Sequence, residues 1–216
     1  MADESQFVEV IKQAKESDKD RKFNQSVEMI MVFKDVDVKK GFAINETVQL
    51  PKKTKPASVC IMASGDMGIK AKNAKADMVM DENELTKLSA DKKKSKKLIN
   101  KYDFFLADTK LMPTVGKKLG QLLGPRGKMP TPVPFNAPIE SFLERFRSSV
   151  KIRAKGSLSM SCRIGEENMD DADLAANASA VATAVEKTLP NGSKNIEKIM
   201  FKTTMGKAVK VEQVKK

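Results

Sequence analysis

The spacing of hydrophobic residues changes twice along this chain, and the two changes limit the folds that it can adopt. Two β-type runs, VEMIMVF at residues 27–33 and ETVQL at residues 46–50, have the composition of half-buried strands. We expect them to form an antiparallel pair. The PKKTKP segment that follows, residues 51–56, cannot extend a central strand because proline has no backbone N–H to donate. A domain boundary is therefore predicted near residues 52–56.

Between residues 57 and 149, short apolar strands alternate with helical segments, an order typical of a parallel sheet covered on both faces. The segment from Ala137 to Ser148 is predicted to be the closing helix of this unit. Alternating strands return at residues 150–155 and 158–164, and residues 196–201 predict a final inner strand. The sequence thus predicts a fold of α+β and α/β class with two domains. One is an antiparallel sheet with helices on one face, built from both termini (residues 1–56 and 150–216), and the other is an inserted Rossmann-like α/β domain (residues 57–149).

Glycines and prolines are concentrated in LGQLLGPRGKMPTPVP, residues 119–134. A backbone so rich in these residues favours an exposed, shaped loop over a helix or a central strand. Arg126 and Lys128 lie among the glycines, where two cations and uncovered backbone N–H groups can approach a phosphate. The whole chain has 40 Lys and Arg against 28 Asp and Glu, a net charge of +12, which favours a polyanionic partner such as nucleic acid.

Several classes of function are disfavoured by what the sequence lacks. It has no histidine, and its two cysteines, Cys60 and Cys162, stand alone in apolar runs, so neither a zinc site nor Ser–His or Cys–His chemistry is expected. We predict buried free thiols, no metal and no cofactor. The glycine spacing matches neither GxGxxG, the fingerprint of dinucleotide binding, nor GxxxxGK followed by Ser or Thr, the fingerprint of nucleoside triphosphate binding. An enzyme built on the α/β unit, with Asp66, Asp81 or Asp108 as catalytic carboxylates, is the weaker alternative.

The first residues, MADESQFVEV, lack the apolar run of a signal peptide, and no segment is apolar over the ~18 residues that a membrane span requires. A cytoplasmic protein without membrane contact is predicted.

Three segments, KFNQSVEM at residues 22–29, LGPRGKMPTPVP at residues 123–134 and KTTMG at residues 202–206, closely resemble the ribosomal protein L1 family. The run from Tyr102 to Pro134 is similar to the archaeal branch of that family. The resemblance implies a structural protein of the large ribosomal subunit with two domains, one of them inserted, and no enzymatic activity. It implies binding to large-subunit rRNA at the mobile stalk near the tRNA exit site, help in releasing deacylated tRNA, and repression of the protein's own mRNA. It also implies a monomer outside the ribosome. A free regulator that binds mRNA without joining the ribosome is the alternative.

Through these motifs, the resemblance implies that six residues of this chain contact RNA: Phe23, Ser26, Glu28, Thr204, Met205 and Gly206. Hydroxyls can pair with ribose 2′-OH groups, glycine lets an RNA backbone approach, and apolar side chains can pack on ribose or base. Packing in the core is the alternative role for Phe23 and Met205. A second group is predicted to reach phosphates or neighbouring RNA: Lys22, Lys151, Arg153, Lys155, Lys202, Thr203, Arg126 and Lys128. The lysine-rich run at residues 92–97 is interpreted as a solvated helix face.

Overall fold

A computed structural model describes residues 4–17, 21–37, 42–52, 54–134 and 138–211 of the chain. The chain divides into two compact units. The terminal unit combines Met1–Lys55 with Ser148–Lys216, and the inserted unit is Pro56–Arg147. The terminal unit contains antiparallel sheets and the inserted unit a parallel one, so the predicted mixed fold class is confirmed.

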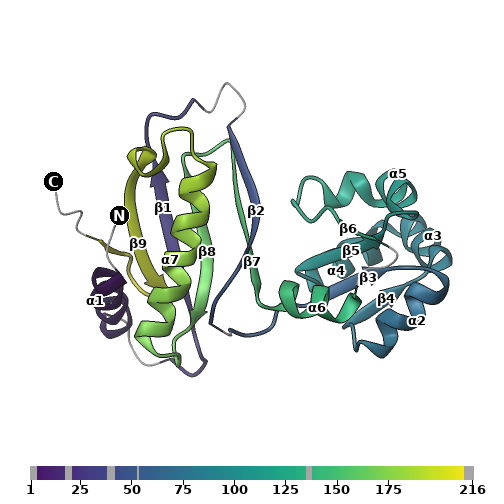
Figure 1. The fold of residues 1–216 in the computed structure, drawn as a ribbon, viewed down its shortest axis with the longest axis horizontal. Coiled ribbons are helices and arrows are strands. Elements are labelled where there is room, and N and C mark those ends of the chain that lie inside the picture. Colours follow the sequence, from purple (N-terminus) through teal and green to yellow (C-terminus); the bar gives the residue numbers. More distant parts are fainter. Residues whose placement is uncertain (1–3, 18–20, 38–41, 53, 135–137, 212–216) are drawn as a thin grey trace. The chain divides into compact units, whose positions relative to one another are not determined.

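A four-stranded antiparallel sheet forms the centre of the terminal unit (Figure 1). Its strands, in order across the sheet, are β10 (Val209–Lys210), β9 (Ile196–Thr203), β1 (Ser26–Phe33) and β8 (Ser159–Glu166). Every second residue of β1 is buried, as the two-residue period of a strand dictates when one face is covered. Helices α1 (Glu4–Glu16) and α7 (Asp171–Thr188) contact each other and contribute to the same core as that face. Residues 192–195 form a short 3-10 helix, η2 (Gly192–Asn195), before β9.

A second, two-stranded sheet in the terminal unit pairs β2 (Ala43–Gln49) with β7 (Ser149–Lys155). The predicted antiparallel pairing of residues 27–33 with 46–50 is therefore wrong. β1 pairs with β8 and β9 instead. An alternating pattern reveals that a strand has one buried face, but it carries no information about which strand lies beside it.

The inserted unit contains a four-stranded parallel sheet in the order β4-β3-β5-β6. The strands are β3 (Val59–Met62), β4 (Met78–Met80), β5 (Phe104–Asp108) and β6 (Thr131–Val133). The helices are α2 (Gly65–Asn73), α3 (Glu82–Ala90), α4 (Lys92–Lys101), α5 (Met112–Leu123) and α6 (Ile139–Arg147). Strand β3 is buried throughout because it serves two cores: Val59 and Ile61 pack with α2 and α6, whereas Cys60 and Met62 pack with α3, α4 and α5. The predicted closing helix corresponds to α6, and Ala137 lies outside the described residues.

The glycine- and proline-rich segment is less irregular than its composition suggests. Residues 119–123 complete α5, and residues 131–133 form β6, so the prediction of a loop throughout is wrong at both ends. Pro132 is tolerated in β6 because this strand, which pairs with β5, lies at the edge of the sheet among the described residues. Between them the chain turns, with Gly127 at a φ of 66°, a backbone conformation that favours glycine.

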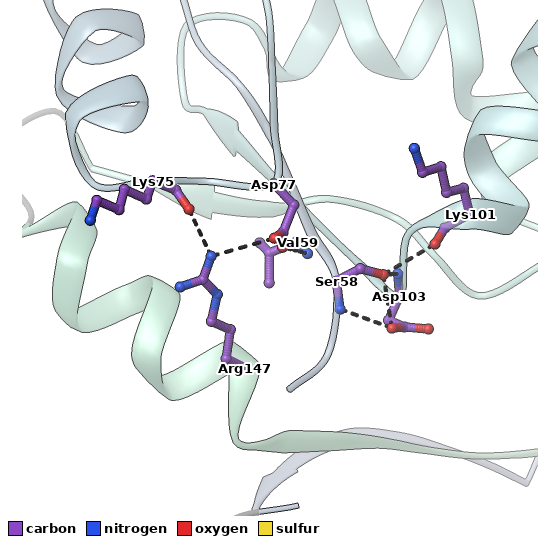
Figure 2. Close-up of polar contacts among 7 residues, drawn as sticks. All are labelled: Ser58, Val59, Lys75, Asp77, Lys101, Asp103 and Arg147. Atoms are coloured by element: carbon purple, nitrogen blue, oxygen red, sulfur yellow. Dashed lines mark hydrogen bonds and ion pairs between the residues drawn. The ribbon is translucent and has the colours of Figure 1, made fainter. Parts of the chain in front are cut away.

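Polar contacts hold the two points where the chain enters and leaves the inserted unit to the rest of that unit (Figure 2). Near the incoming crossing, the backbone N–H of Ser58 donates to Asp103 Oδ2 at 2.9 Å, and that of Val59 donates to Asp77 Oδ2 at 2.8 Å. Arg147, at the outgoing crossing, pairs with the other oxygen of Asp77 at 3.5 Å. Asp77 therefore connects the first strand of the unit to the end of its last helix.

Cys60 and Cys162 are both buried free thiols, as predicted, and lie in different units. Burial, reinforced by nearby carboxylates, raises the pKa of each thiol to about 12. At pH 8 both thiols are therefore protonated, and the thiolate is the nucleophilic form. We expect iodoacetamide at pH 8 to leave the native chain unmodified under conditions that give two adducts in guanidinium chloride, measured by intact mass. Equal modification rates in the native and unfolded chains would contradict this burial.

Candidate nucleic-acid interface

Three distant segments of the sequence meet at one end of the four-stranded sheet: residues 23–28, 163–168 and 202–206. The Ser26 N–H donates to Thr204 Oγ1 at 3.1 Å, and the Thr204 hydroxyl donates back to the Ser26 carbonyl at 3.3 Å. The Asn24 side-chain amide donates to Glu166 Oε2 at 3.0 Å. The structure thus brings the KFNQSVEM and KTTMG motifs together, and we call these three segments the sheet-end cluster.

Gln25 is the buried centre of the sheet-end cluster, with 1% of its surface exposed. Its side-chain carbonyl accepts the Met205 N–H at 3.0 Å, and its backbone carbonyl accepts the Glu167 N–H at 2.8 Å. Gln25 therefore fixes the loop after β9 and the loop after β8 at once. Sequence reasoning missed this residue, because a glutamine just before a strand has no periodic or spacing signature that distinguishes a buried residue from an exposed one.

Two large apolar side chains of the cluster point away from the core. Phe23 is 54% exposed and Met205 is 61% exposed, so the alternative that these residues pack in the core is wrong for both. Phe23 borders a shallow hollow of about 420 Å³, lined by Arg21, Lys22, Phe23, Asn24, Glu167 and Asn168. Exposed apolar groups rimmed by polar and charged side chains are typical of interaction sites.

A local irregularity shapes β8 beside the cluster. In the β1–β8 ladder Val27 lies opposite Gly165 and Glu28 opposite Arg163, so Ile164 is an extra residue in a β-bulge. The carbonyl of Ile164 accepts the Asn177 side-chain amide at 2.9 Å. A Cβ on Gly165 would lie 2.3 Å from Leu174 Cδ2, so only glycine fits here without repacking of the core.

Glu28 is flanked by cations on both sides. In the register of the sheet it lies opposite Lys202 of β9 and opposite Arg163 of β8. Opposite charges on neighbouring strands stabilise each other modestly. The positive charge on the two neighbouring strands offsets part of the repulsion between the Glu28 carboxylate and RNA.

The predicted secondary contacts of the terminal unit differ in accessibility. Lys151, Arg153 and Lys155 alternate with buried Ile152 and Ala154, so the three cations share one face of β7. Lys22 is exposed and Lys202 is half-buried. Thr203 is fully buried, and direct contact between its side chain and RNA would require the strand to rearrange.

In the inserted unit, Arg126 and Lys128 are engaged with α4 and α5. The Lys128 ammonium donates to the carbonyls of Ile99 at 3.0 Å and Tyr102 at 2.6 Å, at the carboxyl end of α4. Burial lowers the pKa of Lys128. Arg126 donates to Asn100 Oδ1 at 3.2 Å and to a carbonyl of α5. Both side chains thus complement the carboxyl end of a helix, where cations are stabilising, and their contact with phosphate stays a prediction.

Two of the three carboxylates proposed for an alternative enzyme, Asp81 and Asp108, bond to nearby backbone N–H groups. Asp81 forms a capping box with Glu84 at the start of α3, and the 4%-exposed Asp108 accepts the Lys110 N–H at 3.1 Å. Asp66 lies in the first turn of α2. Among the described residues, no group of three His, Cys, Asp or Glu side chains is placed to hold a metal ion. Within the same residues, every helix is too short or too polar to span a membrane.

Comparison with known proteins gives one consistent result. The model of the ribosomal protein L1p/L10e family matches residues 11–207. The large ribosomal subunit protein uL1 of Cenarchaeum symbiosum is 69% identical over 210 residues, which cover 97% of each chain. The protein of the same name from Thermofilum pendens is 50% identical over 95% of this chain and 92% of its own. That from Archaeoglobus fulgidus is 40% identical over 98% and 99%.

Proposed function

Because the chain belongs to the ribosomal protein L1p/L10e family, we propose that it is an RNA-binding structural protein of the large ribosomal subunit. As a member of this family it is a ribosomal protein and not an enzyme. We propose that the sheet-end cluster binds large-subunit rRNA at the mobile stalk, near the tRNA exit site. The observation that carries this proposal is the meeting of KFNQSVEM and KTTMG around the buried Gln25, with Phe23 and Met205 exposed beside it.

The chemistry of the cluster suits a structured RNA better than a bare polyanion. Thr204 Oγ1 keeps a lone pair beyond its bonds to Ser26 and can accept a ribose 2′-OH, which distinguishes RNA from DNA. Gly206 lets the RNA backbone approach closely, and Phe23 and Met205 offer apolar surface to ribose or base. Glu28 can accept from a 2′-OH or a base amine. The cations Lys22, Lys202 and those of β7 supply phosphate contacts that position the RNA without reading its sequence.

The same surface serves two RNAs in this proposal. An mRNA segment that reproduces the shape of the rRNA site would fit the cluster equally well, and its occupation would repress synthesis of the protein. At the ribosome, a protein fixed to the stalk by its terminal unit would aid the release of deacylated tRNA, with the basic inserted unit as the part that reaches tRNA. Both roles rest on the family resemblance and on the charge of the chain.

Sedimentation tests the proposed function directly. We expect the purified chain to co-sediment with large ribosomal subunits that lack their own copy of this protein. It should remain bound in about 0.5 M salt, because shape-specific contacts do not depend on counterion release. Excess rRNA stalk fragment should compete, and an equal mass of unrelated duplex RNA should not. Binding that disappears with rising salt and is displaced by any RNA would reject the proposal. Tight mRNA binding without co-sedimentation would instead identify a free regulator.

A further inference from the structure

The outer face of the four-stranded sheet continues well beyond the sheet-end cluster. Strand β1 directs Val27, Met29, Met31 and Phe33 into the core, so Ser26, Glu28, Ile30 and Val32 alternate onto the other face. Ser26 and Glu28 belong to the cluster. We propose that the next two rows of this face, which contain Ile30 and Val32, bind the continuation of the same RNA strand. This inference rests on the proposed function and extends it to a surface outside the motifs.

Apolar side chains occupy the middle of these two rows. Ile30 lies opposite Met200 of β9, and Val32 follows two residues along β1. All three are half-buried and none of them packs against the hydrophobic core of the terminal unit. An apolar strip on a sheet face whose opposite side already holds the core does not stabilise the fold by core packing, and it is available to riboses and base edges.

The groups that flank the apolar strip favour RNA over an acidic protein segment. On one side, Lys210 of β10 lies opposite Met200, and Lys198 of β9 lies opposite Val32. On the other side, the register of β8 places Ser161 opposite Ile30 and Ser159 opposite Val32. Both lysines and both serines are exposed. The rows therefore offer cations for phosphates along one edge and hydroxyls for 2′-OH groups along the other.

The outer face of the sheet from Ser26 to Val32, which we call the extended face, is as long as a short RNA segment. Residues two apart on a strand are separated by about 6.7 Å, so the four rows from Ser26 to Val32 span about 20 Å. None of the residues named above in the Ile30 and Val32 rows is aromatic. Contact with ribose and backbone, rather than base stacking, is the mode that this surface supports.

Three variants of the full chain test the electrostatic and apolar parts of the surface separately. The double variant Lys198→Gln, Lys210→Gln is expected to weaken binding of the rRNA stalk fragment about five-fold in 0.1 M salt and to reduce the slope of log affinity against log salt by about 1.5. Met200→Ser is expected to weaken binding several-fold at every salt concentration with an unchanged slope. Glu197→Gln removes a carboxylate that pairs with Lys198 at 2.8 Å and is expected to strengthen binding.

The matched control is Lys92→Gln, Lys96→Gln, which removes the same charge from exposed positions of α4 in the inserted unit. If the double variant Lys198→Gln, Lys210→Gln binds RNA as this control does, and Met200→Ser binds RNA as wild type does, the extended face is not an RNA surface. Loss of binding in Met205→Ala under those conditions would leave the proposed function intact. Wild-type binding by Met205→Ala, together with equal affinity for all RNAs, would instead reject the proposed function itself. Circular dichroism confirms that each variant is folded.

Discussion

Replacing Asn177 with leucine is expected to lower the free energy of unfolding of the terminal unit by about 3 kcal/mol, because the buried Ile164 carbonyl and both backbone groups of Lys52 lose their partner. Asn177 is fully buried on α7. Its amide donates to the carbonyls of Ile164 at 2.9 Å and Lys52 at 3.4 Å, and its Oδ1 accepts the Lys52 N–H at 2.9 Å. Leucine has the same branched shape with bulkier methyl ends, and it satisfies none of these groups.

The unfolding free energy of this variant is best measured by urea denaturation followed by circular dichroism. Thr183→Ala on the same helix is the control, since Thr183 is exposed and its hydroxyl donates to the Ser179 carbonyl of the same helix. Its effect should stay within about 0.5 kcal/mol. Because Ile164 forms the β-bulge beside the sheet-end cluster, the Asn177 variant should also bind RNA less tightly. Equal stability of the two variants would contradict the role assigned to Asn177.

Replacing Gln25 with leucine is expected to weaken binding of the rRNA fragment by about 2 kcal/mol, or about thirty-fold, while the fold is retained. The leucine cannot accept the Met205 N–H, so the loop at residues 204–206 loses one of the contacts that hold its conformation and keeps those of Thr204 with Ser26. RNA must then restore that conformation before it can bind, and the apparent affinity falls by the fraction of molecules that are no longer in the competent state.

Gln13→Leu supplies the matched control for Gln25→Leu. Gln13 lies on the exposed side of α1, so the same substitution there should leave RNA affinity within about two-fold of wild type. Amide hydrogen exchange gives a readout that does not depend on RNA, since the Met205 N–H should exchange faster in the Gln25 variant. Unchanged exchange together with unchanged RNA affinity would exclude Gln25 as the residue that positions this loop.

Local patterns were sufficient to predict the fold class but not the pairing of strands. Alternation identified β1 and β9, and the change of rhythm after residue 56 identified the parallel sheet of the inserted unit. The partners of β1 come from residues 159–166 and 196–203, more than a hundred positions away along the chain. Such contacts are chosen by the packing of the whole unit on α1 and α7, and no segment of the sequence records them.

The candidate site was predictable only where a motif marked it. Resemblance to a family marked Ser26, Phe23 and Met205. Phe23 and Met205 are exposed and Ser26 bonds to Thr204, and RNA contact by these residues stays a prediction. Gln25 carries no such mark because its importance comes from bonds to two loops that are distant in sequence. Arg126 and Lys128 present the opposite case, since their glycine-rich context suggested phosphate binding and did not reveal their bonds to helix carbonyls.

The measurement that tests the central proposal most directly is RNA binding by wild type and by the double variant Thr204→Ala, Met205→Ala across a salt series. The proposal predicts that one large-subunit rRNA fragment binds tightly at moderate salt, that unrelated RNAs bind far more weakly, and that the folded double variant loses at least about ten-fold in affinity for that fragment. Equal binding of all RNAs, with a steep salt slope and no effect of the double variant, would contradict it, because charge alone would then account for the interaction.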